Sequence, residues 1–60
     1  MNYALIEKGT VTNIIWLLER NTFNFPNAVF IGDKPIKVGD VYLDGKFYRT
    51  NSEGEIINEI

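Results

Sequence analysis

Few side chains in this chain can carry catalysis. It contains neither histidine nor cysteine, and Ser52 is its only serine. A hydroxyl or thiol nucleophile needs a neighbouring base, most often histidine, so no Ser–His or Cys–His pair can form. Ser52 follows an asparagine in a stretch with turn character, where its hydroxyl is expected to bond to the local backbone. The sequence therefore predicts no nucleophilic active site.

The carboxylates are better explained by turns than by chemistry. Asp33, Asp40 and Asp44 each adjoin a glycine, which is typical of turn positions. Paired carboxyls act as acid and base only when they flank a substrate cleft. A calcium site needs about six to eight oxygen ligands, usually from closely spaced acids, and these acids are spread out. We therefore expect no catalytic residue, no metal, no cofactor and no enzymatic activity.

The aromatic side chains are the best candidates for binding, because flat rings on a small sheet can stack on sugar rings or bases. The competing interpretation is that these rings form the core, since each buries about 150–250 Å². This alternative is favoured for Trp16 and Phe47. Tyr42 and Tyr48 are expected on opposite hairpin faces, so at least one points outward. The candidate interaction surface, for a ligand or for the rim of a chain–chain interface, is Trp16, Tyr42, Phe47 and Tyr48.

Length and composition limit the remaining possibilities. The chain has 60 residues, 45% of them hydrophobic, and a formal net charge of -2. A domain of this size buries only about 60% of its unfolded surface, so either a partner chain or a dense apolar core rich in aromatic residues must supply stability. The six basic residues are scattered, which argues against nucleic acid as a partner. No signal peptide or membrane-spanning run is visible, so we expect the bacterial cytoplasm or a virion, and no membrane.

Glycine and proline divide the chain into segments that suit short strands. Strands are expected over 2–7 and 10–18, joined by a two-residue turn at Lys8-Gly9. Apolar residues within 10–18 also match one face of a helix, but their β-branched and aromatic character favours a strand. The expected pairs are Ile6 with Val11, Leu5 with Thr12, Ala4 with Asn13 and Tyr3 with Ile14.

This pairing leaves apolar side chains on both faces of the first hairpin. An antiparallel sheet with one solvated face shows a cleaner alternation. Either the rest of the chain wraps both sides, or a second chain covers one of them. One face is predicted to carry Tyr3, Leu5, Ile14 and Trp16, and the other Ile6, Val11 and Ile15.

Asp44-Gly45 lies between two apolar runs and predicts a second hairpin. Its expected pairs are Leu43 with Lys46, Tyr42 with Phe47, Val41 with Tyr48, and Asp40 with Arg49, the last as an exposed ion pair. Further expectations are a loop over 19–27 from which Phe23 and Phe25 pack back, a short strand over 28–31, and a last strand over 55–60 within a tail, 51–60, that can fray. The prediction is a single all-β domain, 1–60: a small antiparallel meander of four to six short strands.

The opening of the chain also resembles a known group. It follows the pattern Tyr-Ala-x-Ile-Glu-x-Gly-x-Val-x-Asn-x-Ile from Tyr3 to Ile15. This pattern is similar to the start of short proteins encoded among tail genes of phages and prophages. The resemblance implies a phage or prophage setting with a structural or host-contact role, and it carries over no catalytic residue. It continues through 25–29, Ile31-Gly32-Asp33, 39–42 and 44–49.

Three function classes follow. The first is a non-enzymatic structural or assembly protein that associates with itself or with a phage tail protein. The second is a module that binds a glycan or a host surface through outward aromatics, because the segment 38–48 looks like the tyrosine-rich strands of small chitin- and cellulose-binding modules. A third possibility is a small regulator that binds a host protein by strand addition.

Overall fold

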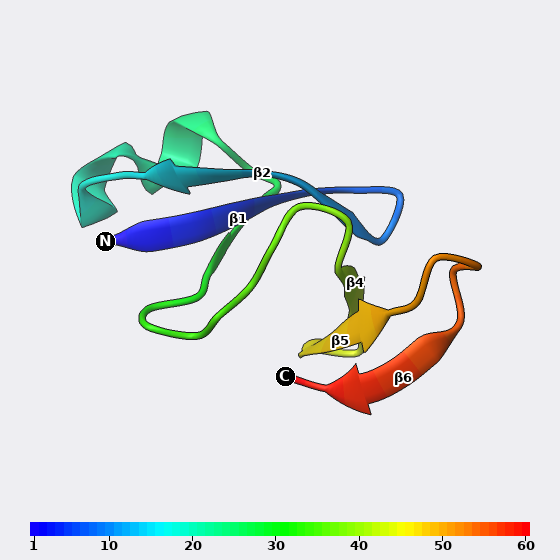
Figure 1. Ribbon diagram of the computed structural model, residues 1–60. Coiled ribbons are helices and arrows are strands. Elements are labelled where there is room, and N and C mark those ends of the chain that lie inside the picture. The colour runs from blue at the N-terminus through cyan, green and yellow to red at the C-terminus, as the bar shows by residue number, and fades with distance from the viewer.

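The computed structural model describes residues 1–60 as one antiparallel sheet of six strands, in the order β3-β1-β2-β4-β5-β6 (Figure 1). The predicted all-β class is confirmed, as are the hairpins at Lys8-Gly9 and Asp44-Gly45. The elements are β1 (Asn2–Glu7), β2 (Thr10–Trp16), a 3-10 helix η1 (Glu19–Asn24), β3 (Ala28–Phe30), β4 (Val41–Leu43), β5 (Lys46–Thr50) and β6 (Ile56–Glu59).

Both hairpins turn through two residues of positive φ. The angles are 51° at Lys8 and 77° at Gly9, and 51° at Asp44 and 81° at Gly45. Two successive positive φ values give a turn whose twist matches that of the flanking strands. The first turn also fixes β4, since the Tyr42 N–H donates to the Gly9 carbonyl at 2.8 Å.

The first hairpin contains a β-bulge that changes the predicted register. Near the turn, Ile6 faces Val11 as expected, but Thr12 has no partner in β1 and Leu5 faces Asn13. The predicted partners of Tyr3, Ala4 and Leu5 are therefore wrong by one residue. The Thr12 hydroxyl donates to the Leu5 carbonyl at 3.3 Å, within the bulge. Because Ile14 now faces Ala4, it shares the face of Val11 and packs against the core.

The core lies between the two hairpins. The strands β1, β2 and β3 join β4 only through the pair of Thr10 with Val41, so the sheet has two halves that can pack on each other. The loop 31–40 runs between the halves in Figure 1 and adds two side chains to the core. The buried core residues are Ala4, Val11, Ile31, Ile36 and Phe47.

An ion pair fastens this loop to β5. Asp40 is only 3% exposed, and its carboxylate accepts from Arg49 Nε at 2.9 Å and from Arg49 Nη2 at 3.1 Å. It also accepts from the Lys37 N–H at 2.8 Å, while Arg49 Nη2 donates to the Pro35 carbonyl at 2.7 Å. The prediction of an exposed pair is therefore wrong for Asp40, because the turn folds the carboxylate inward against the guanidinium.

The environment of Asp40 also shifts its titration. Burial alone raises the pKa of the carboxyl, but the hydrogen bonds from Arg49 and the Lys37 N–H, with the attraction of the Arg49 charge, outweigh it. The net result is a pKa below the ordinary value for aspartate. The folded state therefore favours the ionised carboxylate.

The segment predicted as an irregular loop, 19–27, contains the helix η1. Its backbone N–H groups form hydrogen bonds to carbonyls three residues earlier, as the Asn21 N–H does to the Leu18 carbonyl at 2.9 Å. The Thr22 hydroxyl reinforces it by donating to the Glu19 carbonyl at 2.9 Å. Phe23 is 79% exposed and Phe25 36% exposed, so the expectation that these rings pack back is wrong.

The position of β3 was not predicted. It pairs with β1, on the side away from β2, with Tyr3 opposite Phe30. Since β1 is antiparallel to both neighbours, β2 and β3 run in the same direction and their connection must cross over β1. The N-terminal end of β1 therefore lies between the C-terminal ends of β2 and β3.

No helix of the structure has the length and apolar character that crossing a membrane requires.

Candidate interaction site

The four aromatic residues singled out in the sequence do not form one surface. Trp16 ends β2, whereas Tyr42, Phe47 and Tyr48 lie on β4 and β5. β2 meets β4 at Thr10, and a strand rises about 3.3 Å per residue, so Trp16 lies roughly 20 Å further along. Figure 1 shows the end of β2 at the upper left, well apart from the β4–β5 hairpin below the centre of the molecule.

Their burial differs as well. Phe47 is 3% exposed, so its expected place in the core is confirmed. Tyr42 is half-buried, and its ring centroid lies 4.8 Å from that of Phe47. Trp16 is 65% exposed, so the core interpretation is wrong for it. An interaction role for the half-buried Tyr42 and Tyr48 stays a prediction.

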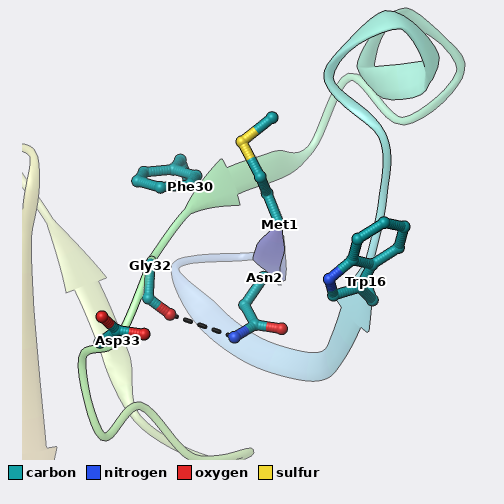
Figure 2. Close-up of a pocket in the computed structure, with 6 residues that line it drawn as sticks. All are labelled: Met1, Asn2, Trp16, Phe30, Gly32 and Asp33. Atoms are coloured by element: carbon teal, nitrogen blue, oxygen red, sulfur yellow. Dashed lines mark hydrogen bonds between the residues drawn. The ribbon is translucent and has the colours of Figure 1, made fainter.

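Trp16 lies beside a shallow hollow at the end of the sheet (Figure 2). Phe30, which is 57% exposed, is on the other side of the hollow, and Met1 lies between the two rings. Asn2 and Asp33 contribute an amide and a carboxylate. The hollow has a volume of about 350 Å³ and is lined by Met1, Asn2, Trp16, Phe30, Gly32 and Asp33.

Local contacts fix the positions of the residues that line this hollow. The Asn2 amide donates to the Gly32 carbonyl at 3.2 Å, which joins β1 to the loop after β3 (Figure 2). The Phe30 ring meets Tyr3 edge to face, with centroids 5.6 Å apart at 72°. Gly32 lets the ring lie close, since a Cβ there would come within 3.3 Å of it.

A second hollow continues the apolar surface beyond Met1. It has a volume of about 470 Å³ and is lined by Met1, Leu18, Glu19 and Arg20. Two backbone hydrogen bonds, each of 2.9 Å, join Met1 to Leu17 at this end of the hairpin. We call the exposed apolar residues around the two hollows the aromatic end: Met1, Trp16, Leu18 and Phe30.

The aromatic end is an apolar surface with polar groups at its rim, and it can bind an apolar group of another molecule. Exposed apolar surface that is contiguous and edged by polar groups is typical of interaction sites. Trp16 supplies a ring and an N–H donor, and Asp33 supplies acceptor oxygens. Phe30 was missed in the sequence because its partnership with Trp16 depends on the pairing of β3 with β1, which no local pattern signals. No protein-family model, curated protein or solved structure matches this chain, so its function is inferred from these residues.

Proposed function

We propose that this chain is a non-enzymatic structural or assembly protein that acts through protein–protein contacts. The observation that carries the proposal is how its apolar side chains are distributed. Six hydrophobic residues are buried, whereas ten large hydrophobic residues are exposed. A surface of this kind is stabilised when another protein covers it, and a core this small benefits from such cover.

The simplest partner is a second copy of the chain, joined through the aromatic end. Trp16 and Phe30 are both more than half exposed, and aromatic side chains dominate the energetics of many interfaces. A two-fold contact would place the same patch on both sides. A phage or prophage setting, with a tail protein as the alternative partner, rests on the resemblance of the opening segment. The proposed location is the bacterial cytoplasm or a virion.

Trp16→Ser is expected to weaken self-association about tenfold or more, because it removes the largest exposed ring of the aromatic end. Sedimentation velocity over a range of protein concentrations measures this. Leu43→Ser is the matched control, since Leu43 is 50% exposed but lies on β4, far from the aromatic end. A wild-type chain that sediments as a monomer up to high micromolar concentration would count against self-association.

A second candidate function is carbohydrate binding, and the hollow between Trp16 and Phe30 favours it. The C–H face of a sugar ring packs well on the negative face of an indole. Sugar hydroxyls could donate to the Asp33 carboxylate, which lines the same hollow. Small-ligand sites commonly combine apolar walls with a few polar groups in this way.

Sugar binding is expected to change the fluorescence of Trp16, the only tryptophan in the chain. Titration with soluble peptidoglycan, teichoic acid and chitin fragments should give a saturable blue shift, because the ligand excludes water from an exposed indole. Asp33→Asn should weaken binding about tenfold by removing a charged acceptor, whereas Asp44→Asn, far from the hollow, should not. An unchanged spectrum with every fragment would remove this candidate.

A further inference from the structure

The strand β6 is an uncovered edge of the sheet. It pairs with β5 on one side only, and it ends the strand order. All four of its residues are exposed, including Ile56 at 51% and Ile57 at 59%. Figure 1 shows β6 on the outside of the molecule, with no other segment beyond it. A strand in this position can pair with a strand from another protein.

The backbone of β6 directs hydrogen-bonding groups outward along this edge. The Ile60 N–H donates to the Phe47 carbonyl at 2.8 Å, so the polar groups of Ile60 face β5. In an antiparallel ladder, successive residues direct their N–H and C=O groups to alternate sides. The N–H and C=O of Glu59 therefore point away from β5, toward the position of an added strand. The C=O also accepts a hydrogen bond from the Asn58 side-chain amide at 3.3 Å, so the N–H is the main group that an added strand can use.

The other open edges are partly occupied by local hydrogen bonds. Beyond the bulge, the outer side of β2 would offer the Ile14 N–H, but the Asn13 side chain already accepts this bond at 2.9 Å. On the outer side of β3, the Ala28 N–H is bonded to the Phe25 carbonyl at 2.9 Å, and the strand has only three residues. β6 contains neither proline nor lysine, two residues that commonly hinder pairing at an edge; its pairing with β5 has a register shift between Arg49 and Thr50, so the part of the edge nearest Glu59 is the regular one.

The charge around β6 indicates the chemistry of its partner. The segment 51–60 contains Glu53, Glu55 and Glu59 and no basic residue. Lys46 Nζ lies 3.9 Å from Glu59 Oε1, but both side chains are more than half exposed. This ion pair therefore offsets the negative charge of the edge only weakly. A second copy of β6 would bring these acids together, whereas a strand with lysine or arginine would be attracted.

We propose that the outer edge of β6 binds an extended, basic segment of a partner protein, which adds to the sheet as a seventh strand. The exposed Ile56 and Ile57 offer apolar contacts to alternate side chains of that segment. The inference rests on the proposed role in protein–protein contacts, but it uses a surface different from the aromatic end. Self-association and strand addition can therefore succeed or fail independently.

The first test uses the wild-type chain and a short synthetic peptide that alternates lysine and valine, followed by ¹H–¹⁵N NMR. Saturable shifts are expected in β6 and β5, and the Glu59 amide should become protected from hydrogen exchange. A peptide of the same sequence with N-methyl groups on alternate residues keeps its charge but loses the donors of one edge, so it should bind about tenfold more weakly. A peptide that alternates glutamate and valine should not bind.

The second test compares two variants of one residue. Glu59→Gln removes a charge and keeps the outward N–H, so it should weaken the lysine–valine peptide only about two- to threefold. Glu59→Pro also removes the N–H, which β5 does not use, and should weaken binding about tenfold or more. Unchanged amide shifts in β1 and β2 confirm that each variant is folded.

Two results would overturn the inference. The first is equal binding of the N-methylated and unmodified peptides, which shows attraction by charge without strand pairing. The second is a set of shifts that maps to the aromatic end, or no shift at all. If the wild-type chain is monomeric but the peptide still protects Glu59, only the proposal of self-association fails.

Discussion

Asp40→Ala is expected to lower the free energy of unfolding by about 2–4 kcal/mol, because it breaks a buried ion pair and leaves the Lys37 N–H without its acceptor. The lower part of the usual range applies because the Arg49 side chain is 29% exposed and water can partly replace the lost partner. A chain of this length has a total stability of roughly 3–9 kcal/mol. The substitution therefore removes a large share of it.

Urea denaturation followed by circular dichroism measures this loss. Asp40→Asn keeps the shape and removes the charge, so it should also destabilise, because the amide N–H groups face the donors of Arg49 and Lys37. Asp44→Asn is the matched control: it makes the same change at an exposed aspartate beside a glycine, in a turn where asparagine tolerates positive φ. Equal stability of Asp40→Asn and Asp44→Asn would contradict this account of the loop.

The same contact predicts a dependence on pH. The pKa of Asp40 is lowered in the folded chain, whereas an unfolded aspartate has a pKa of about 3.9. The contribution of Asp40 is therefore fully present well above about pH 4 and is lost as the pH falls through the folded-state value. Below pH 4, the unfolding free energy of the wild type should fall more steeply than that of Asp40→Asn. Parallel profiles would show that Asp40 does not contribute to acid unfolding.

The turns could be predicted from the sequence because their chemistry is local. Lys8-Gly9 and Asp44-Gly45 each place a glycine where φ must be positive, and each lies between apolar runs. The pairs of the second hairpin follow from its turn, and they match the structure from Leu43 to Tyr48. Phe47 was also expected in the core, where a large ring is needed.

The bulge and the buried carboxylate could not be predicted in the same way. Thr12 and Asn13 are both polar, so their pattern fits a regular strand as well as a bulged one. Asp40 follows a glycine, which predicts a turn but not the side to which the carboxylate points. That side is decided by Arg49, nine residues away, on β5. Both features depend on contacts that form only when the sheet does.

The bulge also changes what the first hairpin implies. The regular register placed Ile14 on the face opposite Val11, and apolar residues on both faces suggested that another chain must cover one of them. In the structure, Ile14 shares the core face with Ala4 and Val11. Of the ten exposed large hydrophobic residues, six lie at the aromatic end or on β6. A partner would therefore cover one of these two defined surfaces and not a whole face of the first hairpin.

Phe47→Ala is expected to cost about 3–5 kcal/mol, which approaches or exceeds half of the total stability of the chain. Phe47 is, with Tyr3, one of two buried aromatic side chains, and it belongs to the core cluster that also contains Val11 of β2 and Ile36 of the loop 31–40, so it joins the halves of the sheet. Little else can fill the space, because the chain has no second core. Thermal unfolding followed by far-ultraviolet circular dichroism should show a largely unfolded chain at room temperature.

A graded series keeps this prediction testable even if Phe47→Ala does not fold. Phe47→Leu retains most of the volume and should cost less than Phe47→Ala, leaving a folded chain with a lower midpoint. Phe23→Ala is the matched control, since the Phe23 ring is 79% exposed and its loss should change stability by no more than about 0.5 kcal/mol. If Phe23→Ala and Phe47→Ala were equally stable, the core would not lie between the two hairpins. A large loss in Phe23→Ala alone would instead place the stabilising contacts of the chain at η1, for example in an interface that only the associated form contains.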